Sequence, residues 1–300
     1  MHRTPVMSSR TLTELSSAPV VLKAELFQRT GSFKLRGVTN RLAALGAEDR
    51  TRGVIAVSAG NHAQALAHGC ATEGIDCLVM MWRGASEAKA AAAAGYGATV
   101  DLESDGPSEA FARMEEIRRE TGRVVVHPFS DPLVIAGQGT VGLEILADVP
   151  DVELVLVPTG GGGLVSGIAA AIKPSSPQVR VVAVEPEQAP ALAEGLSRGT
   201  PVSVDPVSIA DGLAAPYTAT TCIEVCHALG VETVQISEDE IREGLRFVYA
   251  RAKLACEPAG AAGVAALLAG KVDPRGSKTV AVVSGGNVDA AIASATLAGE

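Results

Sequence analysis

The sequence lacks several patterns, and each absence excludes a class of protein. Lysine and arginine number 25 against 34 acidic residues, and no basic cluster stands out, so we expect no nucleic-acid partner. No apolar stretch has the length of a membrane span, and residues 1–5 lack the apolar segment of a signal peptide. We therefore expect no membrane partner.

Cysteine is also sparse and unpatterned. The five cysteines are odd in number and contain no Cys-x-x-Cys pair, which argues against a disulfide framework and favours a reducing cytoplasm. Cys222 and Cys226 stand four apart on a predicted helix, where small buried side chains are a better interpretation than metal ligands.

The composition that is present favours a layered α/β protein. Hydrophobic residues make up 47% of the chain, charged residues 20% and aromatic residues only 3%, a mix that suits a parallel sheet covered by helices. Apolar runs alternate with helical patterns, which predicts right-handed crossovers. The predicted strands are 20–24, 53–57, 77–81, 98–102, 123–127, 152–157, 178–185 and 278–283, and the predicted helices include 86–94, 109–121, 164–172, 239–252 and 259–268.

Four consecutive glycines, Gly160 to Gly163, separate a predicted strand from a predicted helix. Their N–H groups are free of side-chain cover, and a turn of this kind at a helix N-terminus binds an anion. The loop lacks the Lys-Ser/Thr ending of a P-loop and the G-x-G-x-x-G spacing of a dinucleotide site. We expect a phosphate other than that of an ordinary nucleotide, although a flexible turn would have the same sequence.

Lys34 lies in the first turn of a helix that Ser32 is expected to cap. The helix dipole there disfavours the protonated amine, which would make Lys34 a better nucleophile. Gly31 and Gly37 on either side would let a planar ligand approach the backbone. The alternative is a solvated surface lysine.

Two further turns of small residues follow strand ends, at 58–62 and 284–287. Asn61 and His62 stand at a predicted helix N-terminus, where a carboxylate would bind well, although Asn61 could simply be a cap. In open α/β sheets the ligand lies beyond the carboxyl ends of the strands. The three turns therefore predict one site.

These stretches, in this order, resemble the fold-type II pyridoxal-phosphate enzymes, and within them the threonine/serine dehydratases and serine racemases. The resemblance implies a tryptophan synthase β-like α/β fold with two open, twisted, mostly parallel sheets flanked by helices. It further implies a large cofactor-binding domain (1–52 plus 131–300), a small domain (53–130) closing over the active site, and a homodimer. The matching stretches are 25–28, 31–37, 58–62, 127–128, 135–140, 160–163, 209–212, 256–258 and 284–287.

The resemblance assigns a role to each site residue. Lys34 would bind pyridoxal 5'-phosphate covalently and act as acid or base at the substrate Cα, and Phe33 would pack beside the cofactor. Ser284 would face the pyridine nitrogen. Asn61 would bond the 3-oxygen of the ring, and the substrate carboxylate would lie against Ser58, Ala59, Asn61 and His62. The phosphate would be held by the N–H groups of Gly160, Gly161, Gly162, Gly163 and Leu164.

The sequence departs from the family pattern at two places. Ala59 stands where the racemases carry a second serine, so we expect poor racemisation. The family's divalent-cation site would use Glu185 and the carbonyl of Ala189, but the aspartate position holds Ala191. Loss of one hard oxygen ligand weakens such a site, which leaves a divalent cation doubtful.

We therefore expect a lyase that converts L-threonine or L-serine to a 2-oxo acid and ammonia by β-elimination of water. Alternatives are a dehydratase of another β-hydroxy amino acid such as hydroxyaspartate or phenylserine, a serine racemase, a β-replacement synthase, or a non-catalytic binding module. Selectivity for the side chain is expected near Ala59, Phe129 and Ala215.

Overall fold

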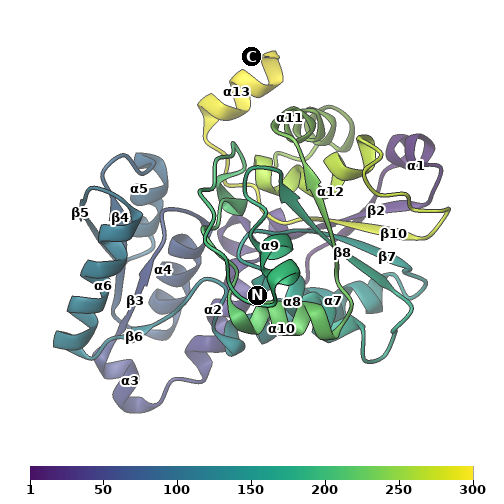
Figure 1. Cartoon of the computed structure of the whole chain (residues 1–300). Coiled ribbons are helices and arrows are strands. Elements are labelled where there is room, and N and C mark those ends of the chain that lie inside the picture. The colour runs from purple at the N-terminus through teal and green to yellow at the C-terminus, as the bar shows by residue number, and fades with distance from the viewer. Residues whose placement is uncertain (300) are drawn as a thin grey trace. The chain divides into compact units, whose positions relative to one another are not determined.

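A computed structural model describes residues 1–299, which fall into two units, each built on its own sheet (Figure 1). Unit 1 comprises residues 1–33 and the chain from Gln138 onward, and unit 2 comprises Lys34–Gly137. The predicted class, two mostly parallel sheets flanked by helices, is confirmed.

The sheet of unit 1 is parallel except at one edge. Its strand order is β1-β2-β10-β7-β8-β9, and β1 pairs with β2 in the antiparallel sense. The strands are β1 (Val6–Ser8), β2 (Val20–Ala24), β7 (Leu154–Pro158), β8 (Arg180–Pro186), β9 (Glu232–Ile236) and β10 (Thr279–Val283).

Both faces of this sheet are buried. On β7, Leu154 and Leu156 pack into one apolar core, whereas Val155 and Val157 pack into another on the opposite face. This alternation follows from the two-residue period of a strand, and burial of both faces explains the continuous apolar runs in the sequence. The helices are α1 (Arg10–Ser16), α7 (Pro132–Asp148, which starts in unit 2), α8 (Gly163–Ile172), α9 (Ala191–Arg198), α10 (Thr220–Ala228), α11 (Glu238–Phe247), α12 (Pro258–Leu268) and α13 (Ala290–Ala298), with 3₁₀ turns at Glu25–Phe27, Arg29–Gly31 and Asp211–Leu213.

Unit 2 repeats the same principle on a smaller, parallel sheet of order β5-β4-β3-β6. On β3, Val54 and Ala56 join one core, and Ile55 and Val57 join another that includes Met114. The elements are α2 (Lys34–Ala43), α3 (Ala47–Arg52), β3 (Val54–Val57), α4 (Asn61–Glu73), β4 (Cys77–Trp82), α5 (Glu87–Gly95), β5 (Thr99–Ser104), α6 (Pro107–Thr121) and β6 (Val124–Val125).

The bounds of unit 2 differ from the small domain expected at 53–130. Leu35 and Val38 of α2 and Val134 of α7 share a core with β3 and α4, so these segments pack with the small sheet. The predicted division into functional domains stays a prediction.

One local expectation was wrong. Ser32 does not cap α2: its hydroxyl is buried and finds no hydrogen-bond partner in residues 1–299, because its extended backbone instead bridges to Gly285. The helix expected over 239–252 is present, as α11 followed directly by a π-helical turn, Val248–Ala252. Five elements have no counterpart among the predicted ones: β1, α1, α3, α9 and β9.

Two further features concern the length of the helices and the state of the cysteines. Within residues 1–299 no helix is both long and apolar enough to cross a membrane. All five cysteines, which lie in this part of the chain, are buried thiols that form no disulfide within it.

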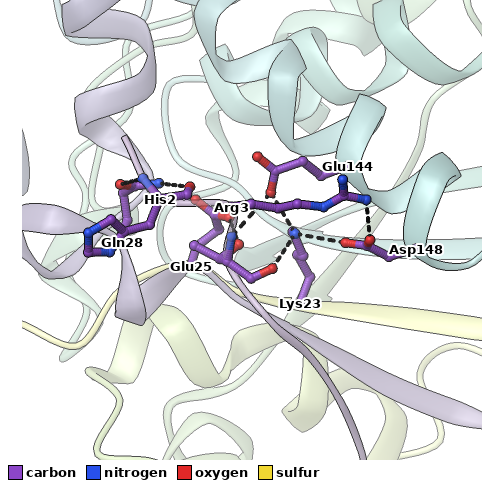
Figure 2. A network of polar contacts seen from close by, with 8 residues as sticks. His2, Arg3, Lys23, Glu25, Gln28, Glu144 and Asp148 are labelled. Atoms are coloured by element: carbon purple, nitrogen blue, oxygen red, sulfur yellow. Dashed lines mark hydrogen bonds and ion pairs between the residues drawn. The ribbon is translucent and has the colours of Figure 1, made fainter.

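A buried ion-pair network connects the N-terminal segment to the sheet of unit 1 (Figure 2). Lys23 of β2 is fully buried, and its Nζ donates to the carbonyl of Thr4 at 2.7 Å and to Glu144 of α7 at 2.7 Å. Asp148 lies 3.5 Å from the same Nζ and also pairs with Arg3. Because the ammonium of Lys23 is buried away from water, these oxygen atoms must compensate for its lost hydration.

We predict that Glu144→Ala lowers the free energy of unfolding by about 3 kcal/mol, because it leaves the buried ammonium of Lys23 poorly compensated. Glu14→Ala is the control, since Glu14 pairs with Arg10 on an exposed face, and we expect a loss of less than about 0.5 kcal/mol. Urea unfolding measures both. Equal losses in the two variants would contradict the prediction.

Candidate active site

The glycine loop connects the end of β7 to α8 and has no room for a side chain at Gly160 or Gly162. A methyl group on Gly160 would lie 2.9 Å from the carbonyl oxygen of Leu213. Gly162, the N-cap of α8, has φ +87°, and a methyl group there would lie 2.9 Å from Cβ of Cys222. Among residues 1–299, no side chain caps this helix start. The bare main-chain donors at a helix N-terminus fit a phosphate group.

Ser284 lies at the same edge of the sheet as this loop. β10 runs parallel to β7 with Ala281 opposite Leu156, so the residues that follow the two strands emerge together. Ser284 is buried and immediately follows Val283, the last residue of β10. The predicted phosphate-binding loop and the predicted pyridine partner therefore lie in one unit.

Phe33 is tied to the same strand end. Its N–H donates to the carbonyl of Ser284 at 3.1 Å, and the N–H of Gly286 donates to the carbonyl of Gly31 at 2.9 Å. The ring of Phe33 packs partly buried against the apolar core beside β7 and α8. Lys34 follows Phe33 by one trans peptide bond, which places its Cα about 3.8 Å from that of Phe33.

In unit 2, Lys34 is the first residue of α2 and is partly buried. Its Nζ donates to the carbonyl of Pro128 at 3.0 Å. The amine is thus directed by a hydrogen bond, and the alternative of a solvated surface lysine does not describe it.

His62 stands in the first turn of α4 and is buried. Its Nε2 lies 2.7 Å from the carbonyl of Val126, and because a carbonyl only accepts, Nε2 carries the proton. Burial, and then the positive charge of Lys34, lower the pKa of His62 to about 3. The imidazole is therefore neutral at pH 7.

His127 is neutral for the same reasons. Its Nδ1 accepts hydrogen bonds from the N–H groups of Phe129 (3.3 Å) and Ser130 (3.1 Å). Burial, followed by the charge of Lys34, lowers the pKa of His127 to about 4. Residues 127–128 were among the matching stretches but had no predicted role. A His-Pro pair after a predicted strand could have indicated a site residue.

The start of α4 is open to an anion. Asn61 is its first residue, and no side chain from residues 1–299 caps it at Gly60. The hydroxyl of Ser58 accepts the N–H of Gly60 at 3.3 Å, and Ala59 packs partly buried against the core of unit 2. The structure therefore brings Ser58, Ala59, Asn61 and His62 to one helix N-terminus.

Glu185 is the C-terminal carboxylate of β8 and is fully buried. Its two oxygens accept the N–H groups of Leu192 (2.7 Å) and Ala193 (3.0 Å) at the start of α9. Burial raises the pKa of Glu185 to about 7 against the opposing effect of these bonds. Residues 1–299 contain no group of three His, Cys, Asp or Glu side chains that could hold a metal, and the ligand set Glu185 and Ala189 stays a prediction.

Comparison with known proteins identifies the family. The family described as "Pyridoxal-phosphate dependent enzyme" matches residues 1–285. The chain is 44% identical over 290 residues to L-threonine ammonia-lyase from Thermotoga maritima, covering 96% of this chain and 72% of the relative. Two solved structures are also similar, threonine deaminase isoform 2 from Solanum lycopersicum in its processed form (31% identity, TM-score 0.94, 100% and 89% covered) and maize serine racemase (34%, TM-score 0.91, 97% and 90%). The chain belongs to the pyridoxal-phosphate dependent enzymes, which confirms the resemblance and the cofactor.

We predict that Gly162→Ala weakens binding of pyridoxal phosphate and lowers the free energy of unfolding by about 1–3 kcal/mol more than Gly199→Ala does. Both glycines have positive φ, but only Gly162 has atoms within 4 Å of an added methyl group. Comparison of the two variants therefore separates the effect of the steric clash at Gly162 from the backbone strain that both variants share. Cofactor titration and urea unfolding measure the two effects, and matching behaviour of the variants would refute the explanation.

The lowered pKa values of His62 and His127 predict that the folded protein loses stability in acid. The folded-state pKa of His62 lies below its ordinary value of 6.5, so the unfolded chain binds a proton first. Stability from its burial is complete above about pH 6.5, and about 2 kcal/mol of it is lost by pH 5.

His62→Gln keeps a donor for Val126 and removes the titrating group, so its unfolding free energy should fall less between pH 7 and pH 5. His227→Gln, on an exposed position of α10, should behave as the wild type. Parallel pH profiles for wild type and His62→Gln would show that this histidine is not the cause.

Proposed function

We propose that the chain is a pyridoxal-phosphate dependent ammonia-lyase that converts L-threonine, L-serine or both to a 2-oxo acid and ammonia. The observation that carries this proposal is Lys34, whose amine is held by a hydrogen bond beside two neutral histidines. The similarity to L-threonine ammonia-lyase over 96% of the chain supports the reaction class.

In this proposal the residues of unit 1 hold the cofactor. The N–H groups of Gly160 to Gly163 and Leu164 bind its phosphate, aided by the dipole of α8. The ring of Phe33 packs beside it, and the hydroxyl of Ser284 faces its nitrogen. A neutral hydroxyl stabilises a protonated pyridine less than a carboxylate would, which suits rapid loss of a β-substituent.

A second group of residues acts on the substrate. Lys34 would hold the cofactor covalently, and its amine would accept the proton from the substrate Cα. Asn61 bonds the 3-oxygen of the cofactor ring, while the start of α4 with Ser58, Ala59 and His62 orients the substrate carboxylate. When bound, the cofactor supplies the electron sink that makes the Cα proton acidic.

The neutral state of both histidines suits the proposed role of the Lys34 amine. An imidazolium at position 62 or 127 would add a positive charge near the amine of Lys34 and repel its cationic form, whereas a neutral ring adds none. We propose that elimination of the β-hydroxyl as water follows loss of the Cα proton, and that water then releases ammonia from the remaining product.

Racemisation is the second candidate, because the chain is similar to a serine racemase structure. Ala59 argues against it: the side chain offers no proton donor or acceptor. A substrate with a larger β-hydroxy side chain remains part of the same proposal and is decided by the experiment below.

We also propose a homodimer in the cytoplasm. Buried cysteine thiols fit a reducing compartment, and Met1, Phe27 and Leu143 of unit 1 expose large apolar side chains that a second subunit could cover. Sedimentation of the purified protein tests the assembly.

The test is a panel of β-hydroxy amino acids (L-threonine, L-serine, hydroxyaspartate and phenylserine) monitored by 2-oxo acid production, with chiral analysis of recovered serine. We expect turnover of L-threonine or L-serine and little D-serine. Lys34→Ala should lower turnover by at least about 1,000-fold, on the order expected when a nucleophile and base is lost.

Lys253→Ala is the matched control, because Lys253 is exposed and its amine donates to the nearby carbonyl of Ala250. It should keep turnover near that of the wild type. Full turnover by Lys34→Ala would overturn the proposal, and product formation only with an added thiol or sulfide would favour a β-replacement synthase.

A further inference from the structure

Thr218 packs against the N-cap of α8. A methyl group placed on Gly162 would lie 3.1 Å from Cγ2 of Thr218 and 2.9 Å from Cβ of Cys222. Thr218 precedes α10 by two residues, and α10 packs against α8. Thr218 therefore packs against the glycine loop, although it is more than 50 residues from Gly162 in the sequence.

The hydroxyl of Thr218 is buried without a partner. The side chain is fully buried, and its Oγ1 has no hydrogen-bond partner in the part of the chain that the structure describes. Burying a hydroxyl without a hydrogen bond is costly, so such a group calls for a ligand or a water.

Two neighbouring hydroxyls have protein partners. Thr159, just before the loop, donates to the carbonyl of Val157 at 2.9 Å. Ser166 of α8 contacts the carbonyl of Cys222 at 3.5 Å and Sγ of Cys226 at 3.4 Å. Of these three hydroxyls, only that of Thr218 lacks a partner among residues 1–299.

We propose that the hydroxyl of Thr218 donates a hydrogen bond to the phosphate of the cofactor and completes the cradle that the glycine loop provides. The inference rests on the proposed placement of that phosphate at Gly160 to Gly163. The non-ester phosphate oxygens are charged acceptors, and a hydroxyl bound to a charged acceptor forms one of the stronger hydrogen bonds. The side chain would thus add a donor to the main-chain N–H groups.

The experiment compares wild type, Thr218→Val and Thr218→Ser as apoenzymes. Each is titrated with pyridoxal phosphate and with pyridoxal, which lacks the phosphate, and ³¹P NMR records the bound cofactor. Thr218→Val should weaken binding of pyridoxal phosphate roughly tenfold or more, leave pyridoxal binding within about twofold and shift the phosphorus resonance. Thr218→Ser keeps the hydroxyl and should restore affinity and resonance.

Thermal unfolding separates this role from a structural one. Valine removes a buried, unpartnered hydroxyl, so the apoenzyme of Thr218→Val should be as stable as wild type or more so. Its stabilisation by pyridoxal phosphate should be smaller. Thr279→Val is the control: Thr279 is equally buried but begins β10, at the opposite end of that strand from Ser284, and cofactor affinity should not change.

Equal effects of Thr218→Val on pyridoxal phosphate and pyridoxal, or no effect on either, would overturn the inference. If Thr218→Val does not fold, a crystal structure of the wild-type holoenzyme decides: Oγ1 within about 3.2 Å of a phosphate oxygen supports it, and a larger separation refutes it. Failure of the wild type to bind pyridoxal phosphate would instead refute the proposed function.

Discussion

The close packing of the glycine loop against its neighbours is the constraint on which unit 1 depends. Gly160 lies against the carbonyl of Leu213, and Gly162 lies against the side chains of Cys222 and Thr218. Side chains at these two positions would push the segments apart. Within residues 1–299 no side chain caps the N-terminus of α8, which lies at the edge of the sheet where Ser284 also emerges.

The segments on either side of the Phe33–Lys34 peptide bond are held by hydrogen bonds. The segment that ends at Phe33 is hydrogen-bonded to the strand end at Ser284. Within unit 2, the carbonyl of Pro128 then directs the amine of Lys34, and buried neutral imidazoles lie nearby. These backbone hydrogen bonds and neutral imidazoles place the amine for the role that we propose for Lys34.

Much of this arrangement could be predicted from the sequence, because it depends on local signals. The strand 20–24 was predicted at its observed bounds, and the turns at 58–62, 160–163 and 284–287 do follow strand ends. The prediction that Ser32 caps α2 was wrong because the extended backbone of Ser32 pairs with Gly285, more than 250 residues away. The contacts of Thr218 with the loop, and of Pro128 with Lys34, likewise depend on long-range packing that no local pattern encodes.

Reduction of the native holoenzyme with borohydride, followed by peptide mass mapping, tests the central claim most directly. The reagent fixes the cofactor to the lysine that carries it. The account predicts that the added mass lies on the peptide containing Lys34 and on no other. Attachment to a different lysine, or no attachment in a protein that turns over its substrate, would contradict it.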